Sequence, residues 1–116
     1  MQSNRPAEAL ESLSRALELK PSNVEIWNNL GNTKQVAHDF DGAIVAYKEA
    51  LKRDRTYADA AGNLLLALSN QALQRTERGQ FNEALASYDT VLLIDPQNQN
   101  ARQRKAQLLQ HLSASQ

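Results

Sequence analysis

The sequence holds few side chains of the types that carry out metal or redox chemistry. It has no cysteine, which excludes disulfides, thiolate zinc sites and cysteine nucleophiles. The two histidines, His38 and His111, lie far apart along the chain, and neither has the ligand spacing of a metal site. We therefore expect both histidines to lie on the surface, and we expect no metal ion and no cofactor.

The acidic residues, glycines and serines do not form a catalytic arrangement either. Asp39, Asp41, Glu49 and Glu83 lie at the starts of predicted helices or at exposed positions, where capping and solubility account for them. The four glycines are isolated, so the sequence has no glycine-rich loop that could hold a phosphate. No general base can be assigned to a serine nucleophile. The sequence therefore predicts a protein that is not an enzyme.

Charge and hydropathy argue against nucleic acid and membrane partners. The 13 basic and 13 acidic side chains cancel to a formal charge of zero, whereas nucleic acid and anionic lipid attract a basic excess. Basic residues gather at 52–55 and at Arg102, Arg104 and Lys105, but only Tyr57 lies near enough to stack on a base. An RNA-binding protein is therefore the least favoured alternative. With no apolar window of roughly 18 to 20 residues and no secretory signal, we expect no membrane partner and a cytoplasmic location.

The apolar residues recur every three or four positions, which is the period of an α-helix, and no segment alternates as a β-strand would. Polar segments separate six predicted helices at about 6–20, 23–37, 40–53, 57–78, 81–94 and 98–113. Helix-capping residues are predicted at Ser22, Asp39, Thr56 and Asn98. Because the connections are short, consecutive helices should be antiparallel. The expected fold class is all-α.

The pattern also repeats along the chain, which indicates a helical array. At an offset of 34 residues Ala9 matches Ala43, Leu17 matches Leu51 and Asn29 matches Asn63; at 41 residues Phe40 matches Phe81, Ala43 matches Ala84 and Tyr47 matches Tyr88. The change from 34 to 41 residues adds seven, which is about two helical turns. One helix between Asn63 and Phe81 is therefore predicted to be longer than its counterpart.

The unit that begins with Trp27, Leu30 and Gly31 and continues with Phe40, Ala43, Tyr47, Ala50 and Leu51 resembles the tetratricopeptide repeat. The resemblance implies an α-solenoid of antiparallel helix pairs. It divides one domain, 1–116, into a half repeat (4–23), a full repeat (24–57), a full repeat with the seven-residue insertion (58–98) and a capping helix (99–116). Lys34, His38 and Arg55 depart from the family pattern.

Two consequences follow from this division. The insertion, placed at 69–78, should extend the first helix of its repeat by two solvated turns that project past the partner helix; a spur for docking a partner is the alternative. The first predicted helix lacks a preceding partner, so the stripe Ala9, Leu13 and Ala16 should be left partly uncovered. Self-association through this stripe is therefore a second hypothesis, which would make the chain a scaffolding segment and a homo-oligomer.

In a helical solenoid the first helix of each pair lines a concave surface that binds partners. If Trp27, Leu30 and Gly31 face inward, the opposite side of that helix and its equivalents should be exposed. The residues predicted to line a peptide-binding groove are Glu25, Asn28, Asn29, Asn32, Gln35, Asp59, Asn63, Ser69, Asn70 and Arg104. Glu25 and Asp59 should make one edge negative.

Amides offer both a hydrogen-bond donor and an acceptor, so a row of them can hold the backbone of an extended peptide. The row resembles the asparagine ladder in the repeat domain of O-GlcNAc transferase. It also resembles the carboxylate clamp of chaperone-binding repeat domains at Asn32, Asn63 and Arg104, although Asn28 and Asn100 stand where that clamp has lysines. We therefore expect a non-catalytic module that binds a protein or peptide, and amides that are only tolerated surface residues are the alternative.

Overall fold

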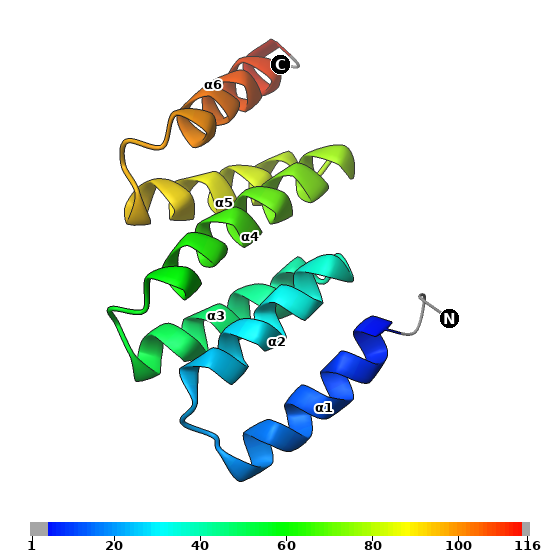
Figure 1. Cartoon of the computed structure of the whole chain (residues 1–116). Helices are drawn as coiled ribbons and strands as arrows, with labels where there is room; N and C mark the ends of the chain where they lie inside the picture. The colour runs from blue at the N-terminus through cyan, green and yellow to red at the C-terminus, as the bar shows by residue number, and fades with distance from the viewer. Residues whose placement is uncertain (1–4, 115–116) are drawn as a thin grey trace. The chain divides into compact units, whose positions relative to one another are not determined.

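The computed structural model describes residues 5–114, and these form six α-helices without a strand (Figure 1). The helices are α1 (Arg5–Leu19), α2 (Val24–Val36), α3 (Phe40–Arg53), α4 (Ala58–Glu77), α5 (Phe81–Ile94) and α6 (Gln99–Ala114). The expected all-α class and the lengthened helix, α4, are confirmed. Each predicted helix agrees with the observed one to within one residue at either end.

The chain forms two compact units that meet inside α4, between Ala67 and Leu68. We call residues 1–67 the amino unit and residues 68–116 the carboxyl unit, and we describe each by itself. The amino unit contains α1, α2, α3 and the first half of α4, and the carboxyl unit contains the second half of α4, α5 and α6.

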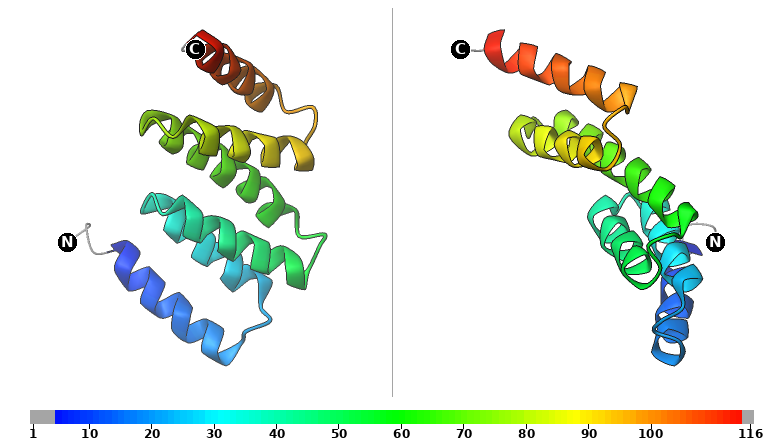
Figure 2. Two further views of the ribbon diagram at one scale, coloured as in Figure 1. Left: turned by 180° about the vertical axis from the view of Figure 1, so that it is seen from behind. Right: turned by 90° about the vertical axis from the view of Figure 1, so that its left-hand side faces the viewer.

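The amino unit is built around the α2–α3 hairpin, with α1 packed beside α2 (Figure 2). Its core contains Leu30, Ala43, Ile44, Ala46, Tyr47, Ala50, Ala60, Leu64 and Ala67. Gly31 is required in this hairpin because a Cβ atom at that position would lie 2.4 Å from the Tyr47 ring. The close approach of α2 to the tyrosine ring explains why a small residue recurs at this place in the repeat.

Trp27 joins the loop between α1 and α2 to the end of α3. Its indole N–H donates to the carbonyl oxygen of Pro21 at 2.9 Å, and the Arg53 Nε donates to the same oxygen at 2.9 Å. The Arg53 guanidinium also lies 4.9 Å from the centre of the Trp27 ring, as a cation–π contact requires. Trp27 is half-buried, as its place in the repeat predicts.

The helix starts agree with the sequence prediction at two of four positions. Asp39 accepts a hydrogen bond from the Gly42 N–H, and Asn98 accepts one from the Ala101 N–H. The cap of α2 is Asn23, which accepts from the Ile26 N–H, so the prediction of Ser22 is wrong by one residue. The Thr56 N–H and hydroxyl both donate to the Asp54 carboxylate, and within residues 5–114 no backbone N–H of α4 donates to the Thr56 hydroxyl.

The carboxyl unit packs the second half of α4 and α6 against α5. Its core contains Leu68, Ala72, Ala84, Tyr88, Val91, Ala101 and Leu108. The buried Ser87 hydroxyl donates to the Gln71 side chain at 2.7 Å and accepts from Arg75 at 2.8 Å. Gln71 and Arg75, which lie in the predicted insertion at 69–78, thus connect α4 to α5.

The expectation that residues 69–78 form two solvated turns beyond the partner helix is wrong. Gln71 and Ala72 are buried, and Arg75 also donates to the backbone carbonyl of Glu83. The reason is the register of the hairpin: α5 turns back at Gly79, so it must pack on the residues of α4 that come just before that turn.

Candidate functional site

An amide network lies where α2, α3 and α4 meet in the amino unit. The Asn63 Nδ2 donates to the Oδ1 of Asn28 at 3.1 Å and to the Oδ1 of Asn32 at 3.2 Å. The Tyr47 hydroxyl donates to the Asn32 Oδ1 at 2.5 Å and accepts from the Gln35 Nε2 at 3.2 Å. Four of the predicted groove residues are therefore brought together: Asn63 ties α4 to α2, and Tyr47, which was predicted only to fill the core, ties α3 to α2.

The network corrects the prediction for Asn28. This residue was expected to be exposed on the groove, but it is buried, with only 6% of its surface exposed. The first half of α4 packs against α2 through Asn63 and covers it. Helical periodicity gives the direction of a side chain but not the width of the surface that a neighbouring helix buries, so the error could not be seen in the sequence.

The other predicted groove residues of the amino unit remain accessible. Glu25, Asn29, Asn32 and Asp59 are exposed, whereas Gln35 and Asn63 are half-buried. Ser69, Asn70 and Arg104 belong to the carboxyl unit, where the first two are half-buried and Arg104 is exposed.

The electrostatics of the amino unit identify an acidic edge. Burial raises the pKa of the Tyr57 hydroxyl, and the negative charges of Asp59, Glu25 and Asp54 raise it further. Three carboxylates therefore act on one hydroxyl group. Tyr47 differs, because burial raises its pKa whereas the hydrogen bond from Gln35 lowers it.

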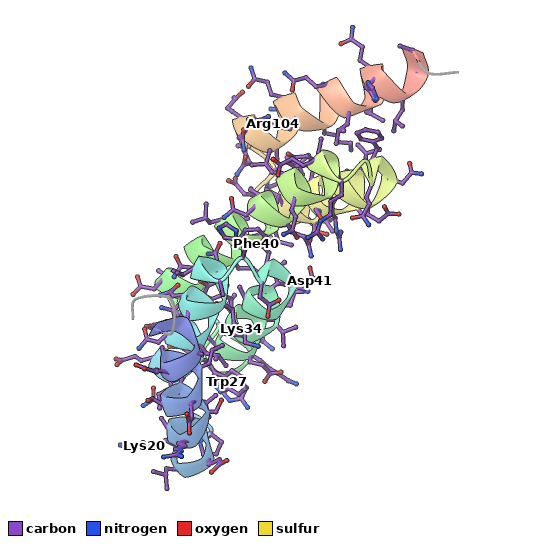
Figure 3. The ribbon with its side chains drawn as sticks, turned by 90° about the vertical axis from the view of Figure 1, so that its right-hand side faces the viewer. Lys20, Trp27, Lys34, Phe40, Asp41 and Arg104 are labelled. Atoms are coloured by element: carbon purple, nitrogen blue, oxygen red, sulfur yellow. The ribbon has the colours of Figure 1, made fainter. Side chains whose placement is uncertain are left out.

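The carboxyl unit contains a pocket of about 230 Å³. Its apolar wall consists of Leu73, Phe81 and Leu108, and its polar groups come from Thr76, Tyr88, Arg104, Gln107 and His111. The rings of Phe81 and His111 lie 4.8 Å apart. Of these residues only Arg104 is among those predicted from the sequence to bind a partner, and the pocket itself was not predicted. Figure 3 shows Arg104 on the first part of α6.

The pocket and the amide network occupy equivalent positions of two hairpins. Counting 41 residues onward, Asn32 corresponds to Leu73, Gln35 to Thr76, Tyr47 to Tyr88 and Asn63 to Arg104. Both tyrosines are buried, at 0% and 1% exposure. The offset of 41 residues, already visible in the sequence, was the signal that could have located the pocket beside Tyr88.

The pKa of the Tyr88 hydroxyl is affected by other groups than the pKa of the Tyr47 hydroxyl. Burial raises the pKa of its hydroxyl, and the positive charge of Arg104 lowers it. The Arg104 Nε donates to the Asn100 side chain at 3.4 Å, but none of the residues described for this chain gives it a carboxylate partner. The neighbouring Lys105, in contrast, pairs with Asp89 at 2.7 Å.

Within residues 5–114 no three histidine, cysteine or acidic side chains lie close enough together to hold a metal ion. In the same part of the chain no helix is both long enough and apolar enough to cross a membrane.

Hairpins that repeat the same buried tyrosine and small residues define a helical-repeat protein. Residues 24–57 match the family model described as a tetratricopeptide repeat, and residues 1–35 match a second model described as a TPR repeat. The chain therefore belongs to the tetratricopeptide-repeat family.

Solved structures show the same fold. The first TPR domain of Spaghetti (RPAP3), bound to the HSP90 peptide SRMEEVD, is 20% identical and superposes with a TM-score of 0.55 over 97% of this chain and 83% of that one. The second TPR domain of human RPAP3, in complex with the HSP70 peptide SGPTIEEVD, is 22% identical with a TM-score of 0.53 over 92% and 83%. MamA is 24% identical with a TM-score of 0.56 over 97% and 62%.

Two curated proteins are related in sequence. Protein FlbA of Caulobacter vibrioides is 32% identical over 89 residues, which cover 77% of this chain and 14% of FlbA. The bifunctional NrfFG subunit of the formate-dependent nitrite reductase complex of Haemophilus influenzae is 36% identical over 80 residues, covering 66% and 21%. The chain thus spans only a small part of the length of either relative.

Proposed function

We propose that this chain is a non-catalytic interaction module that binds an extended peptide, or an extended segment of a partner protein, through amide side chains of α2 and α4. The observation that carries the proposal is the orientation of Asn32 and Asn63 in the amide network. Both side chains are held by neighbouring residues, so they lose little conformational freedom when a ligand binds.

The hydrogen bonds of the network determine what each amide offers to a ligand. Asn63 uses its Nδ2 group inside the network, which leaves its Oδ1 as an acceptor. Asn32 uses its Oδ1, which leaves its Nδ2 as a donor. One donor beside one acceptor matches the C=O and N–H groups of a peptide backbone, and the exposed Asn29 adds a further amide.

The acidic edge at Glu25, Asp59 and Asp54 adds a preference in charge. A peptide that carries a lysine or arginine near this edge would place a cation beside three carboxylates. The structural neighbours bind the acidic peptides SRMEEVD and SGPTIEEVD. In this chain Asn28 and Asn100 replace the lysines expected in a carboxylate clamp, and we therefore expect weak binding of such peptides to the amide surface.

The experiment is a titration of amidated decapeptides selected from an array of extended sequences, with affinity measured by calorimetry. The double variant Asn29→Ala/Asn63→Ala should lose about tenfold in affinity, which is what two hydrogen bonds of roughly 0.5 to 1 kcal/mol each contribute. Asn28→Ala is the matched control, because it removes the bond between Asn28 and Asn63 at a buried position that a peptide cannot touch.

Unchanged affinity in the double variant, with helicity preserved in circular dichroism, would remove the amides from the binding site. Equal losses in the double variant and in Asn28→Ala would assign the amides a structural role alone.

The alternative function is a scaffold segment that self-associates through α1. Ala9, Leu13 and Ala16 are half-buried rather than buried, although α1 packs against α2. Sedimentation over a hundredfold range of concentration distinguishes the two functions, because stacking through α1 makes the apparent mass rise with concentration whereas peptide binding by a monomer does not.

A further inference from the structure

Helices α1 and α6 are each one half of a repeat whose other half is absent from the described part of the chain. Counting 34 residues onward, α1 aligns with α3, the second helix of its hairpin. Counting 41 and then 34 residues back, α6 aligns with α2, the first helix of the same hairpin. Helices α2 and α3 pack against each other, but within residues 5–114 α1 has no first helix beside it and α6 has no second helix.

The surface of α1 that a first helix would cover is partly open. Ala9, Leu13 and Ala16 are half-buried, although α1 packs against α2. The three equivalent residues of α3 are all 0% exposed in the α2–α3 hairpin: Ala43, Tyr47 and Ala50. Helix α1 therefore presents the contact surface of a second helix without the helix that would bury it.

Helix α6 leaves the complementary surface open. Ala106 and Leu109 are exposed, the leucine at 47%. They occupy the positions of Gly31 and Lys34 in α2, and both of these residues lie against α3. The exposed face of α6 is thus the face with which α2 contacts its second helix.

The residues at the centre of these two surfaces are complementary in size. In the α2–α3 hairpin Gly31 makes room for the Tyr47 ring. The equivalent residue of α6 is the larger Ala106, and the equivalent of the tyrosine in α1 is the smaller Leu13. The added methyl group and the lost ring offset each other, as close packing requires. Ala72, which is 0% exposed at the same position of α4, shows that the repeat accepts an alanine there.

The two helices also carry opposite charge. Between residues 7 and 19 α1 has three glutamates and one arginine, whereas α6 has Arg102, Arg104 and Lys105 and no acidic residue. Opposite net charge steers α1 of one copy towards α6 of another. Like charge disfavours the pairing of α1 with α1 or of α6 with α6.

We propose that copies of this chain associate head to tail, and that α6 of one copy and α1 of the next form a complete repeat hairpin. In the register of the α2–α3 hairpin, Ala106 lies against Leu13 and Leu109 packs beside Ala9 of the other copy. This inference rests on the alternative function, self-association through α1, and identifies the surface that α1 meets. Because the two surfaces differ, each pair of copies leaves one α1 and one α6 available, and further copies add to them.

Sedimentation velocity of the full chain over a hundredfold range of concentration tests the assembly. The apparent mass of the wild type should rise beyond that of a dimer. Leu13→Arg and Leu109→Arg should each stay monomeric, because each places an unpaired charge on one of the two surfaces. Mixed in equal amounts, the two variants should form a dimer and nothing larger, since each supplies the surface that the other lacks.

The matched control is Leu93→Arg, which places the same charge on a leucine of α5 that is 83% exposed and lies on neither surface. It should assemble as the wild type does. Circular dichroism shows whether each variant keeps its helices.

A second pair of variants keeps the test decisive if Leu13→Arg does not fold. The chain has no cysteine, so Leu13→Cys and Ala106→Cys introduce one thiol each without adding a charge. Facing residues of a hairpin lie close enough for a disulfide. Under mild oxidation the mixture should therefore give a cross-linked dimer, and neither variant alone should cross-link to a comparable extent.

A wild type that stays monomeric at every concentration would overturn both this inference and the alternative function. Dimers of Leu109→Arg alone, or of Leu13→Cys cross-linked to itself, would overturn the head-to-tail contact in favour of a contact between two α1 helices. Equal losses in Leu93→Arg and Leu109→Arg would overturn it in favour of general association of exposed leucines. Peptide binding is tested separately, because Asn29→Ala/Asn63→Ala should assemble as the wild type does.

Discussion

The α2–α3 hairpin and the hairpin formed by α4 and α5 have the same helical framework, but the side chains around their buried tyrosines differ. Both bury a tyrosine, and both have a buried small residue at the equivalent position of the preceding helix, Gly31 beside the Tyr47 ring in one and Ala72 in the other. The two hairpins differ at the tyrosine hydroxyl, which is enclosed by amides in the first and opens onto an apolar pocket in the second. The repeat thus conserves the packing inside each hairpin and varies the side chains around one hydroxyl group.

The turns of the two hairpins differ in a complementary way. The first has His38 in a left-handed conformation, with φ of 62°, and a good cap at Asp39. The second has Gly79 in the same conformation, with φ of 75°, but Gln80 makes no capping hydrogen bond. Each turn therefore combines one favourable residue with one unfavourable residue, and variants that exchange them test how far the hairpins are equivalent.

The largest expected effect comes from Gly31→Ala. The new Cβ atom would lie 2.4 Å from the Tyr47 ring, and the ring is buried and cannot move away without disturbing the core. We expect the free energy of unfolding to fall by about 1 to 3 kcal/mol, as in other overpacked cores. Urea unfolding followed by circular dichroism measures the change.

Gly62→Ala is the control for Gly31→Ala, since a Cβ atom at that helical position meets nothing within 4 Å. It should raise stability by about 0.5 to 1 kcal/mol through helix propensity. Equal effects of the two substitutions would show that the contact between Gly31 and Tyr47 is not tight.

The second prediction compares the two tyrosine hydroxyl groups. Tyr47→Phe removes the bonds to Asn32 and Gln35 and should cost about 0.5 to 1.5 kcal/mol. Tyr88→Phe removes a hydroxyl that bonds to none of the described residues and should change stability by less than about 0.5 kcal/mol. Urea unfolding of both variants measures the difference, and a larger loss for Tyr88→Phe would mean that the pocket is closed by a bond to Tyr88.

Much of this comparison could be predicted from the sequence, because helical periodicity and the repeat both report on packing. The periodicity gave the helix boundaries, and the offsets of 34 and 41 residues paired Tyr47 with Tyr88. The burial of Asn28 and the packing of residues 69–78 were not predicted, because they depend on which helix covers which face. The pocket was missed for a related reason: Leu73 and Thr76 look like ordinary helical residues until they are placed beside Tyr88.

The third prediction concerns the turn between α2 and α3. A residue with a side chain is strained by about 1 to 2 kcal/mol in the left-handed conformation, and glycine is not. His38→Gly should therefore raise the free energy of unfolding by about 0.5 to 1 kcal/mol. This gain is smaller than the relieved strain because the substitution also removes the stacking of His38 on Phe40, and because glycine has greater conformational freedom in the unfolded chain.

The equivalent change in the other hairpin, Gly79→Ala, should lower stability by a similar amount, because its φ of 75° favours glycine and the site is otherwise open. Chemical denaturation measures both variants, and a loss of stability in His38→Gly would indicate that the contact with Phe40 outweighs the strain.

The smallest effect, and the one most specific to the pocket, is a shift in the titration of Tyr88. All three tyrosines have a raised pKa, chiefly through burial, so they favour the neutral form in the folded protein. Their contribution to stability is complete below the pKa of an unfolded tyrosine, about 10, and is lost as the pH rises through the higher folded pKa.

Arg104 lowers the pKa of Tyr88 alone and so partly offsets the increase that burial causes there. Arg104→Gln should therefore raise the pKa of Tyr88 and leave that of Tyr47 unchanged, which ultraviolet titration of Tyr47→Phe and Tyr88→Phe backgrounds can resolve. An unchanged Tyr88 titration would mean that the guanidinium does not face the hydroxyl, and the pocket would then lack the cation that distinguishes it from the amide network.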